Sequence, residues 1–231
     1  MAGLYRRFRE AGYTTPKFLL PVGERSILQW IVAELAPERL LLIANERDRP
    51  HEAQILQAVA AAGVPNVVVQ FIGDTSGQAE TAAIGARFAV EQGWNGPLIF
   101  HNIDTVVLER DLGAIAAVLA QADGFIDVFV QDSAAYSYVA VTNGFVTRIA
   151  EKVVISPHAT TGLYGFASPT VYLRAAAITT ARSGGEFYIS DVYQRMLDDG
   201  ARIAVRPDPK HRTLVLGTPA QYEAHIAQSQ A

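Results

Sequence analysis

Residues 26–44 read SILQWIVAELAPERLLLIA, and this segment combines a helical pattern with a strand pattern. Apolar residues recur at helical spacing over 26–35, and Ser26 can cap that helix at its N-terminus. Residues 39–44 then form a short apolar run of the length that is typical of a buried strand. The segment therefore predicts a helix followed by a strand.

The same alternation continues to residue 101. It predicts helices over 51–62 and 78–92, and strands over 66–71 and 97–101. Alternation of this kind favours a mostly parallel sheet with helices on both faces, in which ligands bind at the carboxyl ends of the strands. We therefore expect a Rossmann-like α/β fold, with function concentrated in the loops that follow the strands.

Beyond Gly124 the pattern changes from crossovers to hairpins. Strands are predicted at 125–131, 136–142 and 145–150, and Asn143-Gly144 forms a tight turn between the last two. This indicates a small antiparallel excursion in the second half. The remaining predicted elements are a strand at 162–167, helices at 169–181 and 188–199, a strand at 202–205 and a helix after Thr218.

The composition fits one well-buried domain. The chain has 231 residues, of which 50% are hydrophobic and 18% are charged, and no linker or repeat interrupts it. We therefore predict a single domain over 1–231, which we divide into a half over 1–123 and a half over 124–231. The net charge of -4 gives no basic surface for polymeric nucleic acid, and the lack of cysteine excludes disulfides and thiolate metal sites.

The sequence also carries expectations about location and assembly. No apolar run approaches the roughly 20 residues that cross a bilayer, so we expect no membrane span. The chain opens without a signal peptide, which favours the cytoplasm. None of the five histidines has a metal-ligand spacing. The sequence leaves a homo-oligomer open.

The opening residues 1–22, MAGLYRRFREAGYTTPKFLLPV, place glycine and basic residues around a loop before the first predicted helix. Backbone N–H groups near Gly3 can approach phosphate oxygens, while Arg7 and Lys17 can neutralise charge between the α- and β-phosphates of a nucleoside triphosphate. The alternative is a solvated basic loop in which Pro16 is a turn residue, and physical argument alone leaves the two readings about even.

These residues resemble the signature of the sugar-phosphate nucleotidyltransferase family, and the resemblance covers nearly the whole chain. The matching segments are 1–3 (MAG), 7–8 (RF), 11–13 (AGY), 16–17 (PK), 20–22 (LPV), 74–81 (DTSGQAET), 101–106 (HNIDTV), 150–152 (AEK), 161–166 (TGLYGF), 185–193 (GEFYISDVY) and 216–222 (LGTPAQY). The family resemblance implies a GT-A-like fold and Mg²⁺-dependent attack of a sugar phosphate on the α-phosphate of a nucleoside triphosphate.

The resemblance also implies a role for each matching residue. The implied catalytic residues are Arg7, Lys17 and Asp104, of which Asp104 also binds the metal. The resemblance makes 1–123 the nucleotide-binding half, and the implied nucleotide-binding residues there are Ala2, Gly3, Gly77, Gln78, Glu80 and Asn102. The implied sugar-phosphate-binding residues, in the half over 124–231, are Glu151, Lys152, Gly162, Tyr164 and Glu186.

Asp104 is the strongest of these from the residues themselves. It follows an apolar strand, so it is expected at the carboxyl edge of the sheet, where a carboxylate can hold Mg²⁺ against phosphate oxygens. The alternative is an aspartate that caps the next turn. Asn102 can reach the same region, or it can satisfy the backbone of its loop.

Other positions also have alternatives. Glu80 falls where many relatives place Gln; because a carboxylate only accepts hydrogen bonds, it favours guanine, but it also fits a solvated first helical turn. Glu151 and Lys152 should point to opposite faces while their strand stays regular, so at most one would face a pocket, and an exposed strand end explains both. Glu186 alone is an acidic residue near a helix N-terminus, and Tyr164 can simply pack on the sheet.

Three departures from the family pattern stand out. Relatives carry a short apolar strand before the Met-Ala-Gly segment, and we expect an upstream strand or another segment to fill that place. Tyr5 and Arg6 replace the small residues of many relatives, and Tyr5 could obstruct the triphosphate. Val215 stands where a second metal carboxylate is usual, which leaves one-metal chemistry or a ligand such as Asp191 or Asp208.

The leading functional hypothesis is an enzyme that makes a nucleoside-diphosphate sugar and pyrophosphate, and the resemblance suggests surface-polysaccharide precursor synthesis. One alternative is a catalytically impaired domain that binds a nucleotide or nucleotide sugar. Another is a nucleotidyltransferase for a non-sugar acceptor such as phosphocholine.

Overall fold

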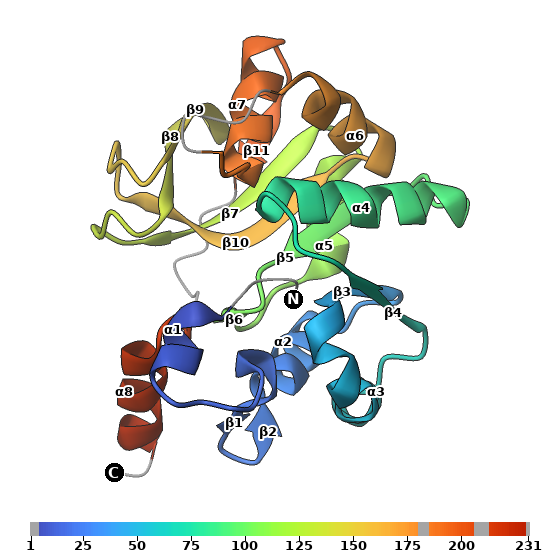
Figure 1. The fold of residues 1–231 in the computed structure, drawn as a ribbon. Helices are drawn as coiled ribbons and strands as arrows, with labels where there is room; N and C mark the ends of the chain where they lie inside the picture. Colours follow the sequence, from blue (N-terminus) through green and yellow to red (C-terminus); the bar gives the residue numbers. More distant parts are fainter. Residues whose placement is uncertain (1–4, 180–184, 206–212, 230–231) are drawn as a thin grey trace. The chain divides into compact units, whose positions relative to one another are not determined.

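The computed structural model describes residues 5–179, 185–205 and 213–229, and the chain divides into two compact units (Figure 1). The first unit comprises 1–74, 102–112 and 211–231, and the second comprises 75–101 and 113–210. The units therefore interleave along the chain. The halves that we predicted, 1–123 and 124–231, were defined by function and stay predictions. That 1–231 acts as one domain stays a prediction.

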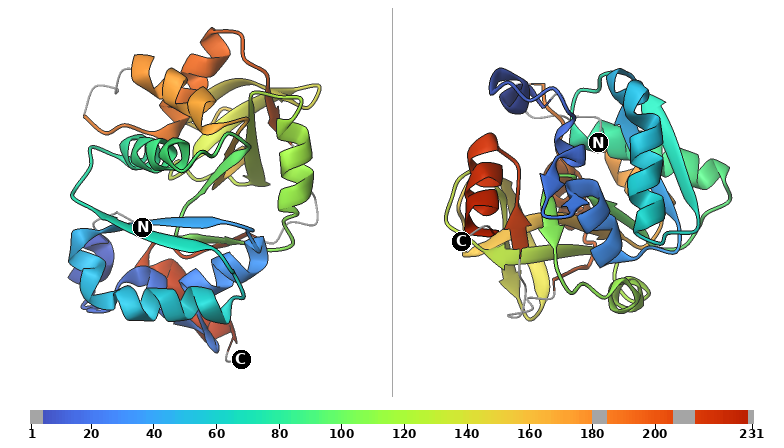
Figure 2. Two further views of the ribbon diagram at one scale, coloured as in Figure 1. Left: turned by 90° about the vertical axis from the view of Figure 1, so that its right-hand side faces the viewer. Right: turned by 90° about the horizontal axis from the view of Figure 1, so that it is seen from below.

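The first unit contains a parallel strand pair with two helices on one face. Strand β3 (Leu40–Asn45) pairs in parallel with β4 (Val67–Ile72), and Asn45 lies opposite Ile72. Helix α2 (Ile27–Leu35) begins at Ser26, whose side chain accepts from the backbone N–H of Gln29 as predicted. Helix α3 (Glu52–Ala61) runs along the pair (Figure 2), and Leu28, Leu42 and Ile55 share one hydrophobic core.

A second core of the first unit joins segments that are far apart in sequence. Strand β6 (Thr105–Val107) pairs antiparallel with β12 (Thr213–Val215), and Phe8, Val106 and Tyr222 pack together. The other elements of this unit are α1 (Arg6–Glu10), η1 (Lys17–Leu19), β1 (Pro21–Val22), β2 (Arg25–Ser26), η2 (Glu46–His51) and α8 (Pro219–Ser229).

The second unit is built on a six-stranded sheet in the order β5-β10-β7-β11-β9-β8. Its strands are β5 (Leu98–His101), β7 (Gly124–Val130), β8 (Ser137–Thr142), β9 (Phe145–Glu151), β10 (His158–Phe166) and β11 (Ile203–Val205). Of the pairings in this sheet, β11 with β7 is parallel and the others are antiparallel. An additional pairing of β10 with β8 closes a ring of five strands.

The fold is therefore a mixed α/β fold, and the prediction of a mostly parallel sheet is wrong. The reason lies in which strands become neighbours: β4 and β5 follow each other in the chain, but β4 pairs with β3 while β5 pairs with β10. Helix–strand alternation gives a parallel sheet only when successive strands enter the same sheet. The predicted hairpin at Asn143-Gly144 is confirmed, since both residues have positive φ and join β8 to β9.

Three helices pack on the sheet of the second unit. Helices α4 (Gln78–Glu91), α6 (Pro169–Ile178) and α7 (Ile189–Asp198) contribute to one hydrophobic core, and all three were predicted. Two buried tyrosines fix them through backbone carbonyls: Tyr172 Oη donates to Ala79 O at 2.6 Å, and Tyr193 Oη donates to Gly165 O at 2.7 Å.

Helix α5 (Leu112–Leu119) and the short elements β6 and β12 were not predicted. Within the ranges that the structure describes, no helix has the length and apolar character needed to cross a bilayer.

Candidate functional site

Lys17 and Asp104 meet in the first unit, although 87 residues separate them in sequence. Lys17 begins η1 and is 9% exposed, and Asp104 lies immediately before β6. Lys17 Nζ donates to Asp104 Oδ2 at 3.2 Å. A Cβ built on Gly217 would lie 3.5 Å from the same oxygen, so the glycine after β12 borders the pair closely. A buried cation and a partly exposed carboxylate therefore share one small site.

The other implied residues of the phosphate loop are only partly described. Arg7 lies in α1 with its side chain exposed to solvent. Ala2 and Gly3 lie outside the described residues. Asn102 lies in the first unit, two residues before Asp104. The roles assigned to these four residues stay predictions.

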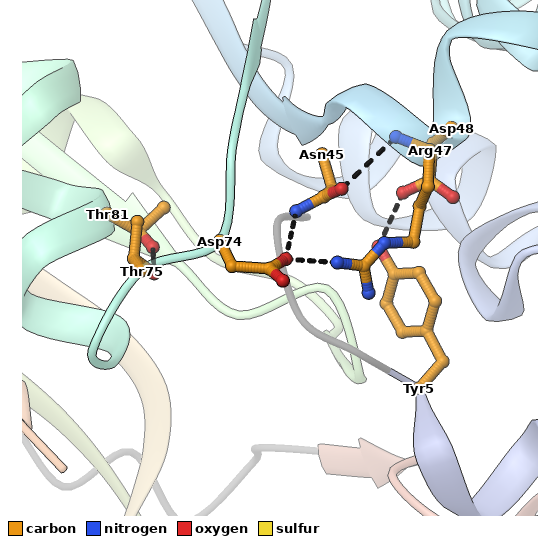
Figure 3. A network of polar contacts seen from close by, with 7 residues as sticks. All are labelled: Tyr5, Asn45, Arg47, Asp48, Asp74, Thr75 and Thr81. Carbon is orange, nitrogen blue, oxygen red and sulfur yellow. Dashed lines mark hydrogen bonds and ion pairs between the residues drawn. The ribbon is translucent and has the colours of Figure 1, made fainter. Parts of the chain in front are cut away.

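Tyr5 lies in the first unit and packs against its two hydrophobic cores. Its ring meets Phe18 edge to face with 5.8 Å between centroids, and Lys17 Nζ lies 5.9 Å from its centroid. Its hydroxyl donates to Asp48 Oδ2 at 3.3 Å (Figure 3). Burial, followed by the nearby Asp48, raises the pKa of Tyr5, so the hydroxyl keeps its proton and acts as a donor.

Asp48 is the buried carboxylate of this cluster, with 2% of its surface exposed. Burial raises its pKa, although Tyr5 and the cations Arg47, His51 and Arg9 oppose that rise. A raised pKa in the folded state means that Asp48 favours folding at pH values below its ordinary pKa of about 4, and that this contribution is lost as the pH rises through the folded value.

We therefore expect Asp48→Asn to gain stability relative to the wild type as the pH rises, because the amide never carries the buried charge. The measurement is the free energy of unfolding in urea at steps from about pH 3.5 to pH 7. The variant minus wild-type difference should grow over that interval. A difference that stays constant with pH would contradict a raised Asp48 pKa.

A polar network joins the carboxyl ends of β3 and β4 (Figure 3). Asn45 Nδ2 donates to Asp74 Oδ1 at 2.9 Å, and Asn45 Oδ1 accepts from the backbone N–H of Arg47 at 3.1 Å. The guanidinium of Arg47 forms an ion pair with Asp74. Asn45 and Arg47 were not predicted from the sequence, although Asn45 is a polar residue that ends an apolar strand, which is a usable signal.

In the second unit, Gly77 makes a close backbone contact with the segment before α7. A Cβ at Gly77 would lie 2.5 Å from Phe187 O and 2.7 Å from Phe187 N, and Ala79 N donates to the same carbonyl at 2.9 Å. The glycine is therefore needed for protein packing, independently of a nucleotide. Gln78 is the first residue of α4.

Glu80 forms hydrogen bonds with the loop that precedes α4. Its Oε2 accepts from Ser76 N and from Ser76 Oγ, both at 2.6 Å, and these hydrogen bonds lower the pKa of Glu80. Next to this loop, the hydroxyls of Thr75 and Thr81 are 2.8 Å apart (Figure 3). Local donors thus account for the acidic residue at this position, and its preference for guanine stays a prediction.

Three implied sugar-phosphate residues come together beside the N-terminus of α7. Ser190 Oγ donates to Glu151 Oε2 at 2.8 Å, and Ser137 Oγ donates to the same oxygen. Lys152 Nζ donates to Tyr188 Oη at 2.7 Å, and Tyr188 in turn donates to Glu186. These hydrogen-bonding partners, Ser137, Tyr188 and Ser190, were missed from the sequence.

The expectation that at most one of Glu151 and Lys152 would face this region assumed a regular strand. Strand β9 ends at Glu151, and Lys152 has a left-handed backbone with φ of 55°. That turn ends the alternation of faces, so both side chains contact the 186–190 segment.

Tyr164 and Gly162 lie on β10. Tyr164 is 3% exposed within the hydrophobic core, and its hydroxyl is 3.0 Å from Thr160 Oγ1. The Tyr164 side chain therefore packs on the sheet, as the alternative interpretation expected. Gly162 has φ of 90° at an irregularity in the pairing of β10 with β7, a conformation that favours glycine.

The described residues contain no group of three or more acidic or histidine side chains that could hold a metal. Val215 lies opposite Thr105 in the β12–β6 pair, next to Asp104, so no second carboxylate comes from that strand. Asp191 serves as a cap, because its Oδ2 accepts from the backbone N–H of Tyr188 at 3.2 Å. Asp208 lies outside the described residues. Among these carboxylates, Asp104 is thus the remaining candidate for binding a metal ion.

Comparison with known proteins identifies curated relatives of this chain. No model of a known protein family matches the chain. The chain is 26% identical over 214 residues to the bifunctional protein GlmU of Micrococcus luteus, a match that covers 83% of this chain and 43% of that protein. GlmU of Cupriavidus metallidurans is 25% identical, with coverage of 95% and 48%. The chain therefore spans about half the length of these curated relatives.

Solved structures agree with these relatives. A nucleoside-diphosphate-sugar pyrophosphorylase from Vibrio cholerae matches with a TM-score of 0.86 and 26% identity, covering 98% of both chains. A putative glucose-1-phosphate thymidylyltransferase from Bacillus anthracis matches with a TM-score of 0.81 at 16% identity, which supports the fold alone. The resemblance predicted from the sequence is confirmed: the chain is related to the sugar-phosphate nucleotidyltransferases.

Proposed function

We propose that this chain is a nucleotidyltransferase that couples a nucleoside triphosphate to a sugar 1-phosphate. A phosphate oxygen of the sugar 1-phosphate attacks the α-phosphorus, the bond between that phosphorus and the bridging oxygen to the β-phosphate breaks, and pyrophosphate leaves. The products are a nucleoside-diphosphate sugar and pyrophosphate. The observation that carries the proposal is the contact between buried Lys17 and Asp104 in a relative of enzymes with this chemistry.

Lys17, Arg7 and Asp104 each have a distinct role in the proposed reaction. Lys17 places a positive charge where negative charge accumulates on the oxygens around the α-phosphorus, and its low exposure strengthens that interaction. Arg7, on the exposed face of α1, neutralises the phosphates as they bind. Asp104 keeps Lys17 oriented and remains partly open to solvent. Catalysis then rests on positioning and electrostatics.

The residues present fit Mg²⁺ that is shared with the substrate. Mg²⁺ is commonly held by one or two carboxylates together with substrate phosphates and water, and Asp104 offers one carboxylate at the edge of the site. When bound, the ion would supply charge neutralisation between the phosphates. Val215 contributes no ligand, so the proposal is for a single protein carboxylate.

The test is pyrophosphate release with Mg²⁺ across a panel of nucleoside triphosphates and sugar 1-phosphates, on this chain and on the chain extended upstream by its natural coding sequence. Phosphocholine is included as a non-sugar acceptor. Release that requires both substrates supports the proposal and identifies the base and the acceptor. If neither protein releases pyrophosphate while nucleotide binding is retained, the proposal is wrong, and the alternative of a nucleotide-binding domain stands.

The cluster of Glu151, Lys152 and Glu186 supports a sugar as the acceptor, because it sets carboxylate acceptors beside a cation that suits a phosphate. We expect Glu151→Gln to raise the KM for the sugar phosphate about tenfold or more with a smaller change in kcat, since a hydroxyl donor loses its charged acceptor.

Initial rates at varied sugar phosphate would check this. Glu91→Gln, at the exposed end of α4 in the same unit, is the matched control. An unchanged KM in Glu151→Gln would argue against the sugar assignment.

The location and the pathway are part of the same proposal. We propose that the reaction takes place in the cytoplasm and supplies precursors for surface polysaccharides. Support for that pathway is the family relationship alone.

A further inference from the structure

Tyr5 has a backbone conformation that favours glycine. Its φ of 47° and ψ of 31° place it in the left-handed region, where a side chain with a Cβ is disfavoured. Such a conformation persists when the surroundings fix it. The contacts of Tyr5 must therefore compensate for the strain.

Those contacts come from two elements of the first unit. Phe18, which is fully buried on η1, forms a T-shaped contact with the Tyr5 ring. Asp48, on η2, is 2% exposed and accepts from the Tyr5 hydroxyl at 3.3 Å. Figure 3 shows the ring directed toward η2, with its hydroxyl next to Asp48. The ring is thus fixed by an aromatic contact and by its hydroxyl group.

The fixed ring borders Lys17. Lys17 Nζ lies 5.9 Å from the ring centroid, within the range of a cation–π contact, and 3.2 Å from Asp104 Oδ2. A lysine side chain has four rotatable bonds and loses much conformational freedom when it is held in one position. The ring and the carboxylate together restrict where the ammonium group can lie.

We propose that Tyr5 is a positioning residue that keeps the Lys17 ammonium on Asp104, with the Tyr5 hydroxyl held by Asp48. The proposal rests on the proposed function for its catalytic consequence. Where many relatives have a small residue, this chain thus has a fixed aromatic ring next to Lys17. Tyr5 acts through Lys17 and need not touch a substrate.

The first measurement does not require turnover. The lysines of the chain are Lys17, Lys152 and Lys210, so the acetylation rate of Lys17 by acetic anhydride can be followed by mass spectrometry against Lys152, which lies in the second unit. Tyr5→Leu removes the ring and should raise the Lys17 rate about tenfold. Tyr5→Phe keeps the ring, loses the hydrogen bond to Asp48 and should raise the rate two- to threefold.

The second measurement is steady-state kinetics on the same proteins. Tyr5→Leu should lower kcat about tenfold while the KM for the nucleoside triphosphate changes less than threefold, and Tyr5→Phe should recover most of kcat. Val59→Ala, a buried change on α3, controls for a general loss of stability and should leave kcat and Lys17 acetylation unchanged. A merely structural role would make Tyr5→Leu behave like this control.

The outcomes separate this inference from the proposed function. A wild-type Lys17 acetylation rate in Tyr5→Leu overturns the positioning role, whether or not the enzyme turns over. If Tyr5→Leu does not fold, an unchanged rate in Tyr5→Phe overturns the role of the Asp48 contact. A raised acetylation rate in a chain whose wild type releases no pyrophosphate upholds the positioning role and refutes the proposed function instead.

Discussion

Asp104→Asn is expected to lower the rate of pyrophosphate release about a thousandfold. The substitution keeps the size of the side chain but removes the negative charge that faces Lys17 at 3.2 Å and that would hold Mg²⁺ against the phosphates. Removing one preorganised electrostatic group from an active site typically costs a factor of about 10² to 10³, and loss of a metal carboxylate adds to that. The measurement is kcat at saturating substrates over a range of Mg²⁺ concentrations.

The same substitution should cost little stability. Lys17 is buried, but Asp104 has about a third of its side chain exposed (34%), so water partly screens their attraction, and the Asn oxygen can still accept from Lys17; we expect a loss of about 1 kcal/mol. Glu46→Gln is a suitable control, because Glu46 is an exposed carboxylate of the same unit that pairs with Arg49. A rate in Asp104→Asn within tenfold of the wild type would remove Asp104 from the mechanism.

Gly77→Ala is expected to destabilise the second unit by about 3 kcal/mol. The added Cβ would lie 2.5 Å from Phe187 O and 2.7 Å from Phe187 N, and both are backbone atoms that cannot rotate away. Overpacking of this kind costs about 1–3 kcal/mol, and the displaced segment also carries the hydrogen bond from Ala79 N to Phe187 O. In a chain of this size, the midpoint of thermal unfolding should fall by about 10 °C.

Gly96→Ala is the matched control in the same unit, because the nearest atom to its added Cβ lies 3.6 Å away. It should change the midpoint by no more than about 2 °C. Circular dichroism melts of the two variants give the comparison. If the two variants melt together, the close contact between Gly77 and Phe187 is not rigid.

Periodicity predicted the long elements well, because a helix such as α4 presents several turns of apolar spacing to one core. It failed for β6 and β12, since strands of three residues are too short to show alternation. Periodicity also could not predict which strands pair. Strand β5 pairs with β10, about 60 residues further along the chain, and tertiary packing determines that pairing.

The candidate site, like the fold, could be predicted only in part from the sequence. Resemblance identified Lys17 and Asp104, and the structure brings them into contact. The resemblance could not predict the contacts of Tyr5 with Asp48 and Phe18, because only tertiary neighbours can accommodate a large residue at a left-handed position. Ser190 and Tyr188 were missed for a related reason, since hydroxyl groups next to a helix start carry no distinctive sequence signal.

The interleaving of the two units has a consequence for synthesis on the ribosome. Residues 113–210 complete the second unit, whereas β12 and α8, which pack into the core of the first unit, come later in the chain. Strand β6, which carries Val106, must therefore wait for its partner until residues 108–212 have been made. A nascent chain stopped near residue 210 would contain all of the second unit, whereas its first unit would lack the partner strand of β6.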